Sequence, residues 1–205
     1  MISSAKLSKT EEEKLMRLPR KHKAALGWVL VDIKGISPSI CMHKIMLEDE
    51  VKPTIKHQRR LNLTMKEVVW KKVLKWLDAG VIYPISNSLW VSPVQVMPKN
   101  GGMMVVRDAD NKQIPTRMVT RWRICMDYQK LNKVTRKDHF PLPFIDHMLD
   151  KLVRHEYYCF LDGYLGYNQI AITLEDQEKT IFTCLYGIFA FRRMPFGLCN
   201  APATF

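Results

Sequence analysis

The stretch FLDGYLGYNQI, residues 160–170, decides how this chain is interpreted. Apolar and aromatic residues lead up to a single carboxylate, Asp162, and a glycine follows it immediately. The run YYCFLD, residues 157–162, predicts a short strand that ends at Asp162. An unpaired carboxylate is costly to bury, so an acid in this place calls for a function. Asp162 is therefore a candidate site residue.

Composition limits the classes of partner. The chain has 205 residues, of which 47% are hydrophobic, enough for one sizeable core or two small ones. Lys and Arg number 32 against 20 Asp and Glu, a formal net charge of +12. This charge favours a polyanionic partner, nucleic acid first and an anionic membrane surface second. No apolar run reaches the roughly 18 residues of a spanning helix, and the first residues lack the apolar region of a signal peptide, so we expect an intracellular protein.

The five cysteines are spread singly along the chain, with no C-x-x-C pair. This spacing indicates neither a zinc site nor a disulfide framework. We expect reduced thiols in the core. His147 and His155 lie eight residues apart without a carboxylate or cysteine in a ligand register, so they are interpreted as surface histidines.

Residues 1–57 are predicted to hold little core of their own. A charged helix is expected over residues 9–26, followed by the Gly- and Pro-marked stretch DIKGISPS and the strand-like CMHKIML. This segment is interpreted as a connector, with the hypothesis that it joins to an upstream part of a longer polyprotein.

An amphipathic helix is predicted from Thr64 onward. Thr64 and Glu67 form a T-x-x-E capping box, and apolar residues recur at helical spacing until Gly80 ends the run. The outward face carries Lys66, Lys71, Lys72 and Lys75. These lysines fit a solvated face and a phosphate-facing role equally well, so both remain open.

Strands joined by hairpins are expected over residues 81–128, where β-branched and aromatic runs alternate with Pro, Gly and Asp-Asn turns. Asp108 and Asp110 form a D-x-D pair, which a turn explains better than a metal site does. Pro141 and Pro143 open a second amphipathic helix. A further hairpin is expected to turn at Tyr186-Gly187, and a last helix to begin with Asn200 as its N-cap.

Three blocks together carry a resemblance: RWRICMDYQKLNKVTRKDHFPLP, EYYCFLDGYLGYNQI and YGIFAFRRMPFGLCNAPATF. In order and spacing they resemble the reverse transcriptase of Gypsy-type long-terminal-repeat retrotransposons, particularly the plant elements. The upstream blocks DIKGISPSICMHKIMLED, HQRRLN, WLDAGVIYPIS and WVSPVQVMPKNGG are similar to the same family. The likeness runs from about residue 11 to the end of the sequence, and several blocks in register make it specific.

The resemblance implies the fingers and part of the palm of a right-hand polymerase, an α+β fold in which an antiparallel sheet packs with helices. It divides the chain into an N-terminal connector (1–57), a fingers-like region (58–152) and a partial palm with the first catalytic aspartate (153–205). It implies an RNA-directed DNA polymerase, which adds deoxynucleotides to a primer with two Mg²⁺ ions. Expected partners are an RNA or DNA template with its primer, deoxynucleoside triphosphates and the rest of a Pol polyprotein, with no membrane. The expected location is a cytoplasmic virus-like particle or the nucleus.

The resemblance also assigns site residues. Asp162 matches the family's first catalytic carboxylate and Mg²⁺ ligand, and Gly163 lies beside the triphosphate. Tyr167 matches the bulky gate against the 2′-hydroxyl, Arg123 the arginine that covers the triphosphate, and Phe196 a residue that lines the nucleotide pocket. Independent chemistry agrees, because Mg²⁺ prefers carboxylate oxygens, glycine allows close backbone approach and the guanidinium fork suits phosphate.

Four of these residues also have a purely structural interpretation: Asp162 as a turn aspartate, Tyr167 and Phe196 as core aromatics, and Arg123 as a surface arginine. The chain departs from the family pattern at Gln129, where arginine is usual, and at Leu165, where serine is usual. The family's second metal-binding block, an aromatic-x-Asp-Asp hairpin, is not in these residues.

One carboxylate cannot build a two-metal site, so we expect that the chain alone does not polymerise DNA. The alternative is a non-catalytic retroelement remnant that acts at most as a basic nucleic-acid-binding module. A third is a product without function, in which Tyr158, Phe160, Phe189 and Phe191 lie uncovered.

Overall fold

The computed structural model describes residues 6–27, 32, 35–107, 113–141 and 143–205, and the chain divides into two units, residues 1–34 and 35–205. The first unit holds helix α1 (Lys9–Lys21) and a short 3₁₀ turn, Lys23–Ala25. Ser8 and Glu11 form a capping box at the start of α1. The helix predicted over residues 9–26 is therefore present, but its α-helical part ends at Lys21.

A five-stranded sheet organises the second unit. Its strands lie in the order β2-β7-β6-β3-β4, and they span Ile82–Pro84, Gly187–Phe191, Phe182–Cys184, Ser92–Arg107 and Gln113–Met126 respectively. All neighbours are antiparallel except β3 and β6. A second, parallel pair joins β1 (Met42–His43) to β5 (Ala171–Ile172). The predicted α+β class with a mainly antiparallel sheet is confirmed.

Helix α2 (Leu63–Asp78) covers part of this sheet. Its buried residues Val69, Val73 and Trp76 form the inner stripe, and the Trp76 ring lies edge-on to Phe182 and Phe191, at 6.3 and 5.5 Å between centroids. The predicted cap at Thr64 is wrong, because the amide of Met65 donates to the side chain of Asn62, 2.8 Å away, and α2 begins one residue before Thr64. Gly80 follows the helix at φ +64°, as a C-terminal glycine does.

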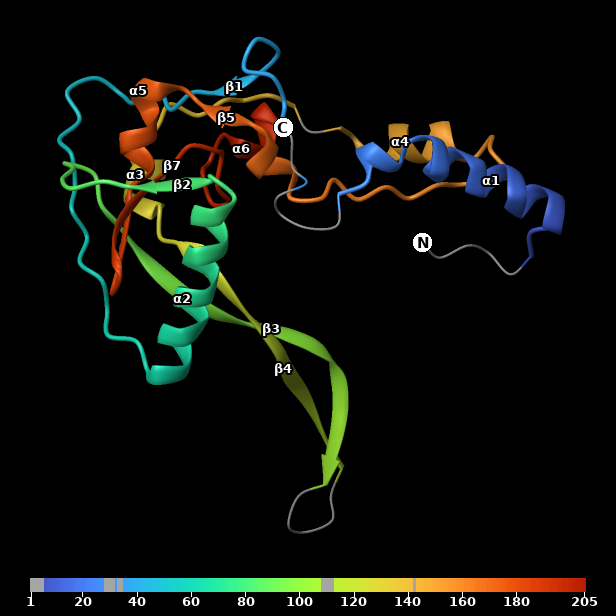
Figure 1. Cartoon of the computed structure of the whole chain (residues 1–205), viewed down its shortest axis with the longest axis horizontal. Helices are drawn as coiled ribbons and strands as arrows, with labels where there is room; N and C mark the ends of the chain where they lie inside the picture. The colour runs from blue at the N-terminus through green and yellow to red at the C-terminus, as the bar shows by residue number, and fades with distance from the viewer. Residues whose placement is uncertain (1–5, 28–31, 33–34, 108–112, 142) are drawn as a thin grey trace. The chain divides into compact units, whose positions relative to one another are not determined.

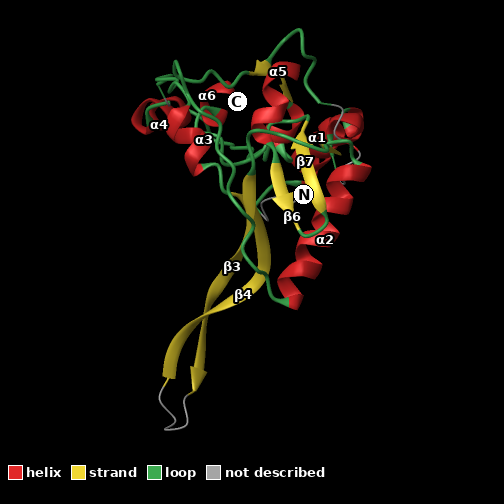
Figure 2. Ribbon diagram, turned by 90° about the vertical axis from the view of Figure 1, so that its left-hand side faces the viewer, coloured by secondary structure: helices red, strands yellow, loops and turns green. Residues whose placement is uncertain are grey.

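Strands β3 and β4 leave the sheet as a two-stranded ribbon (Figures 1 and 2). Only Ser92 and Pro93 of β3 pair with β6, whereas β3 and β4 stay paired from Val94–Met126 to Arg107–Gln113. The register shifts near Asn100, which bends the ribbon there. Asp108 and Asp110, considered above as a D-x-D pair, lie outside the described residues.

The remaining elements are short. They are α3 (Gln129–Val134), α4 (Ile145–Leu152), a 3₁₀ turn (Gly166–Gln169), α5 (Leu174–Gln177), a second 3₁₀ turn (Glu178–Thr180) and α6 (Ala201–Thr204). The β6–β7 hairpin turns at Leu185-Tyr186, close to the predicted place. None of the helices in the described ranges is long and apolar enough to cross a membrane.

Asn200 precedes α6 as predicted, but its side chain does not cap that helix. Instead the amide group donates to the carbonyl of Arg136 and accepts from the amide of Asp138, at 2.8 and 3.1 Å. Asn200 therefore fixes the loop after α3. A four-residue helix gains little from a cap, whereas a loop without regular pairing needs partners for its backbone groups.

The strand predicted over residues 157–162 is wrong. This segment has no regular secondary structure, and all its side chains are exposed, with Phe160 92% accessible. None of the strands described pairs with it, and an unpaired strand cannot satisfy its backbone hydrogen bonds or bury a face. Tyr158 is exposed as well, as expected of an uncovered palm, whereas Phe189 and Phe191 are buried.

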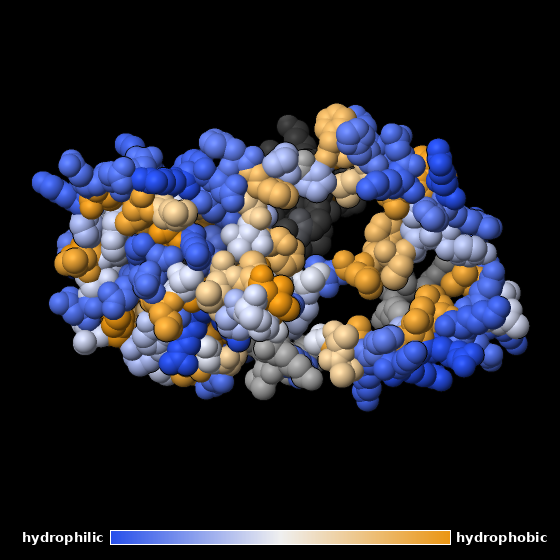
Figure 3. All heavy atoms as spheres, turned by 90° about the horizontal axis from the view of Figure 1, so that it is seen from above, coloured by the Kyte–Doolittle hydropathy of each residue, from blue (hydrophilic) through white to orange (hydrophobic). Residues whose placement is uncertain are grey.

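Helix α4, the second predicted amphipathic helix, is exposed as well. Its apolar residues and the one directly after it are all accessible to solvent: Ile145, Met148, Leu149, Leu152 and Val153. Figure 3 shows apolar side chains at the surface among hydrophilic ones. All five cysteines are free thiols, but the prediction that they lie in the core is wrong for two of them. Cys184 is buried, whereas Cys125 and Cys159 are exposed.

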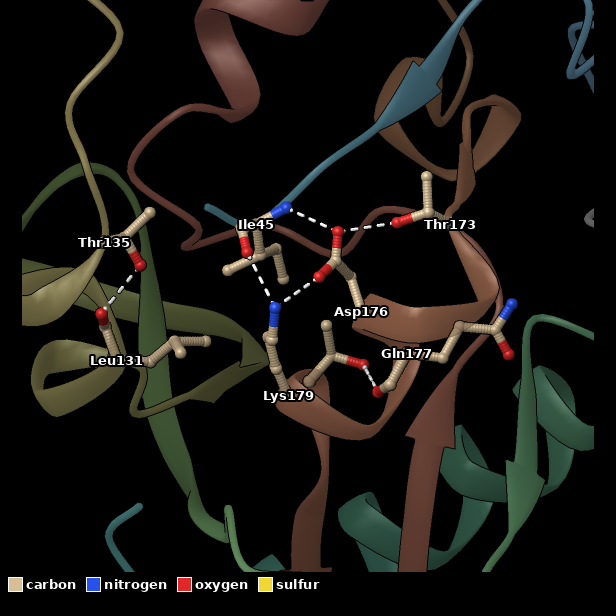
Figure 4. A network of polar contacts seen from close by, with 8 residues as sticks. Ile45, Leu131, Thr135, Thr173, Asp176, Gln177 and Lys179 are labelled. Carbon is tan, nitrogen blue, oxygen red and sulfur yellow. Dashed lines mark hydrogen bonds and ion pairs between the residues drawn. The ribbon is translucent and has the colours of Figure 1, made fainter. Parts of the chain in front are cut away.

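A buried carboxylate joins residues 42–47 to the C-terminal half of the chain (Figure 4). Asp176 accepts hydrogen bonds from the amide of Ile45 (2.8 Å) and the hydroxyl of Thr173 (2.6 Å), and pairs with Lys179 (2.5 Å). The Lys179 ammonium also donates to the carbonyl of Ile45, 2.9 Å away. Burial raises the pKa of Asp176, but these hydrogen bonds and Lys179 outweigh it and hold the pKa below its ordinary value.

A second carboxylate, Asp127, holds the next part of the N-terminal segment. It is buried, pairs with Lys56 and accepts from the side-chain amide of Gln95 at 2.9 Å. The side chain of Gln58 both donates to and accepts from the backbone of Val94, at 2.9 and 2.7 Å. Residues 42–58 are therefore fixed to the core. The domain boundaries at 57/58 and 152/153 stay predictions, since the only division of the chain into units falls after residue 34.

Replacing Asp176 by Asn should lower the free energy of unfolding by about 3 kcal/mol, because the change leaves Lys179 without its buried partner. Urea unfolding measures it. The matched control is Glu175→Gln, which removes one negative charge from an exposed neighbour and should stay within about 0.5 kcal/mol of the wild type. Equal losses in both variants would contradict the role of Asp176.

Acid should destabilise the fold through His43. This ring is 1% exposed, and its Nδ1 lies 2.8 Å from the Thr204 hydroxyl. Burial lowers the pKa of His43 below its ordinary 6.5, although the Asp176 carboxylate opposes the shift. The unfolded chain therefore binds the proton more readily, and the free energy of unfolding falls as the pH drops below about 6.5.

Denaturation curves between pH 5 and about 7 should show this loss in the wild type and a smaller one in His43→Gln. The control His155→Gln alters an exposed histidine and should keep the full pH dependence. The assignment fails if His43→Gln and the wild type lose stability equally.

Candidate nucleotide and catalytic site

The 3₁₀ turn Gly166–Gln169 carries Tyr167 and is held on several sides. The buried side chain of Asn168 donates to the carbonyl of Met194, 3.3 Å away. The carbonyl of Gln169 accepts from the amide of Ile36 (2.7 Å) and from the guanidinium of Arg193 (3.1 Å). The backbone position of Tyr167 is therefore fixed by residues far away in the sequence.

Two of the predicted site residues meet at this turn. The rings of Tyr167 and Phe196 lie 4.7 Å apart between centroids, tilted by 35°. Phe196 is 61% exposed, so the pair presents an aromatic surface to solvent. Phe205 completes the cluster, with its ring edge-on to Tyr167 at 5.3 Å. Tyr167 is partly buried, and its contacts with these two rings favour one orientation, as a gating residue requires.

Gly166 allows Phe205 to lie so close. A methyl group at this position would come within 2.6 Å of the Phe205 ring, and one at Gly163 within 3.5 Å. Both glycines therefore border the aromatic cluster. Sequence reasoning selected Gly163 but missed Gly166, Asn168 and Phe205. The available signal was the small residue directly before Tyr167, which indicates close packing at that point.

Asp162 lies in the exposed segment just before this turn rather than at a strand end. In the described part of the chain, its carboxylate makes no hydrogen bond or ion pair. Its oxygens have the chemistry that Mg²⁺ prefers. However, the residues described include no group of three His, Cys, Asp or Glu side chains that could hold a metal ion. The donor set thus has one suitable ligand and does not by itself fit a two-ion site.

Arg123 lies on a different element from the aromatic cluster. It is exposed on β4, opposite Met97 of β3, and belongs to the ribbon. Arg121 lies two residues away on the same strand face and is also exposed. Among the described residues, Arg123 makes no hydrogen bond or ion pair with Asp162, Tyr167 or Phe196. The structure thus brings together Gly163, Tyr167 and Phe196, with Asp162 next in sequence, and leaves Arg123 on the ribbon.

The two departures from the family pattern have different settings. Gln129 is exposed at the start of α3, and its backbone amide donates to Asp127 at 3.3 Å. Leu165 has left-handed backbone angles, φ 48° and ψ 40°, directly before the 3₁₀ turn. A branched apolar residue has a steric cost in this conformation, which glycine and asparagine adopt more readily. The strain therefore lies one residue before Gly166 and two before Tyr167.

The chain is similar to known reverse transcriptases and retrotransposon polyproteins. Residues 106–205 match the family model described as reverse transcriptase (RNA-dependent DNA polymerase). The retrovirus-related Pol polyprotein from transposon 297 of Drosophila melanogaster is 36% identical over 153 residues, 75% of this chain and 13% of that protein. The corresponding polyprotein from transposon gypsy of the same organism is 34% identical over 141 residues, 69% and 12% of the two chains.

Solved structures show the same fold. The crystal structure of the prototype foamy virus protease-reverse transcriptase has a TM-score of 0.73 and 25% identity, and it covers 97% of this chain and 24% of that one. A foamy viral protease-reverse transcriptase in complex with an RNA/DNA hybrid has a TM-score of 0.66 and 20% identity, with the same coverage. The chain thus spans about an eighth of the two transposon polyproteins and about a quarter of these viral chains.

Replacing Leu165 by Asn should raise the free energy of unfolding by about 1 kcal/mol, because Asn tolerates left-handed angles. Glu50→Asn tests the same effect at the other left-handed non-glycine residue among those described, φ 57°, and should also stabilise. Leu161→Asn makes the same side-chain change at an exposed site without such angles and should give no gain. Loss of stability in both Leu165→Asn and Glu50→Asn would contradict the strain assigned to these backbone angles.

Proposed function

The chain belongs to the reverse transcriptases of Gypsy-type long-terminal-repeat retrotransposons, and we propose that it forms the fingers and first palm segment of an enzyme that extends a DNA primer along an RNA or DNA template. The substrates in this proposal are deoxynucleoside triphosphates. The observation that carries it is the Tyr167–Phe196 ring pair beside Gly163 and Gly166, directly after Asp162. This arrangement suits a pocket for a sugar and a base next to a metal-binding carboxylate.

Tyr167 is proposed as the residue that excludes ribonucleotides. Its ring contacts Phe196 on one side and Phe205 on another, and these contacts favour one orientation. A fixed ring would clash with a 2′-hydroxyl, the one atom that separates the two classes of substrate. Phe196 supplies an exposed apolar surface for the sugar or the templating base. Discrimination would thus depend on the packing of three rings.

Arg123 is proposed to bind the triphosphate. Its guanidinium offers planar, paired donors that match phosphate oxygens, and it lies exposed on the ribbon. Among the described residues Arg123 makes no hydrogen bond or ion pair with Tyr167 or Phe196, and in this proposal the ribbon brings its guanidinium to the bound nucleotide. Closure of a mobile element over its substrate is a common way to complete a site and exclude water.

Asp162 is proposed to hold Mg²⁺ in the complete enzyme. Two magnesium ions would neutralise charge on the primer 3′-oxygen and on the leaving pyrophosphate. The described residues supply one carboxylate toward such a site. We therefore propose that the 205-residue chain by itself does not polymerise DNA. What it retains in this proposal is the nucleotide-facing surface and the positive charge.

Binding of nucleic acid is the function proposed for the chain alone. A net charge of +12 favours sequence-independent contacts to phosphates, which release counterions and are therefore sensitive to salt. The foamy viral protease-reverse transcriptase of similar fold, solved in complex with an RNA/DNA hybrid, supports a primer–template as the partner. The rest of a Pol polyprotein is a further proposed partner, because the matched relatives are Pol polyproteins. A virus-like particle in the cytoplasm or the nucleus is the proposed location.

The purified chain should show no Mg²⁺-dependent primer extension, but it should bind a labelled primer–template. If about six phosphates are contacted, affinity should fall by about 10³-fold between 50 and 200 mM salt. Fluorescence anisotropy measures the binding and gel analysis the extension. Extension that disappears in Asp162→Asn would overturn the proposed inactivity. Absence of any complex at low salt would overturn the binding function.

A further inference from the structure

Two exposed aromatic rings contact each other, with their planes tilted by 46°, on the outer side of α2, away from the cluster around Tyr167. Trp70 of α2 and Tyr186 of the β6–β7 turn are 42% and 40% exposed, and their centroids lie 4.6 Å apart. The buried stripe of the same helix consists of Val69, Val73 and Trp76. Trp70 therefore does not belong to the core, although it is the largest kind of apolar side chain.

The hydroxyl of Tyr186 fixes this ring pair. It donates to the backbone carbonyl of Lys66, 3.2 Å away, in the first turn of α2. The hairpin turn is thus anchored to the helix one turn before Trp70. Both rings keep about two fifths of their surface open while their relative position is set. A preformed aromatic surface of this kind binds without a further cost of ordering side chains.

Helix α2 carries lysines close in sequence to Trp70. Lys66 lies four residues before Trp70 and hence on the same side of the helix, and Lys71 follows Trp70 directly. Lys71 pairs with Glu67 at 2.6 Å, while Lys75 lies further along the exposed side. Helix α2 contains four lysines and only two acidic residues. The sequence left open whether these lysines are solvated or face phosphates, and the ring pair beside them favours the second interpretation.

We propose that Trp70 and Tyr186, together with Lys66, form a platform that binds single-stranded nucleic acid. Bases would stack on the open ring surfaces, and the adjacent ammonium group would contact the phosphate backbone. The proposal deepens the nucleic-acid-binding function given above and rests on it. A protein partner is the less suitable occupant, because lysine is depleted at the centre of protein interfaces.

The test uses the full chain and a fluorescent oligo(dT) of about 15 nucleotides, with affinity measured as a function of salt. Trp70→Leu should weaken binding about tenfold without changing the slope of log affinity against log salt. Trp70→Phe keeps a ring and should recover most of the affinity. Lys66→Ala should instead reduce the magnitude of the salt slope by about 0.7.

Leu63→Ala is the matched control, since it removes an exposed apolar side chain from the first turn of the same helix and should leave affinity unchanged. Tyr186→Phe removes the hydroxyl that anchors the turn but keeps the aromatic ring, so it should weaken binding less than Tyr186→Leu does. Thermal unfolding of every variant shows whether the fold is kept. A Trp70→Leu variant that unfolds is replaced by Trp70→Met.

Equal oligo(dT) affinity for wild type, Trp70→Leu and Tyr186→Leu would overturn the platform while leaving the proposed function intact, provided that the wild type still binds primer–template. Loss of all binding by the wild type would instead overturn the function on which the platform rests. Self-association of the wild type that Trp70→Leu abolishes, with no change in nucleic-acid affinity, would identify a second copy of the chain as the occupant and also overturn the proposal.

Discussion

The buried carboxylate of Asp176 is the contact on which the arrangement of this chain depends. It joins Ile45 in the N-terminal segment to Thr173 and Lys179 beside β5. These two residues lie more than a hundred positions after Ile45 in the sequence. A buried charge is tolerated only when it is paired and hydrogen-bonded, and here every partner is in place. Because β5 directly follows the turn that carries Tyr167, this contact also determines where the candidate site lies.

The aromatic residues of the candidate site are held by contacts with one another, whereas its acidic residue is exposed. Tyr167 is held by backbone contacts and by the rings of Phe196 and Phe205, while Asp162, five residues earlier, is exposed and makes no hydrogen bond or ion pair within the described ranges. The difference follows from the neighbours available to each residue. The turn packs against residues 193–205, whereas none of the strands that the structure describes pairs with residues 157–162. Recognition of a nucleotide and binding of a metal are thus separate capacities in this chain.

Two surfaces of the same protein are proposed to bind different ligands, the ribbon a nucleoside triphosphate and the outer side of α2 single-stranded nucleic acid. The ribbon offers guanidinium groups at Arg121 and Arg123, which suit phosphates, and the outer side of α2 offers rings beside ammonium groups, which suit unpaired bases. The departures at Gln129 and Leu165 touch neither surface directly. Leu165 matters through its backbone, since its left-handed angles start the turn that presents Tyr167.

The sequence by itself determined the elements whose signals are local. Apolar spacing predicted α2, alternating β-branched runs and turn residues predicted β3, β4 and the β6–β7 hairpin, and successive motif blocks identified the reverse transcriptase family. Local pattern also misled, because Asn62 competes with Thr64 as a cap and the apolar run at 157–162 needs a partner strand that spacing does not reveal. Only the tertiary structure decided which residues far apart in sequence meet: Asp176 with Ile45, Phe205 with Gly166 and Tyr186 with Trp70. Such contacts form because folding closes long loops around a shared core, and no short window of sequence contains both partners.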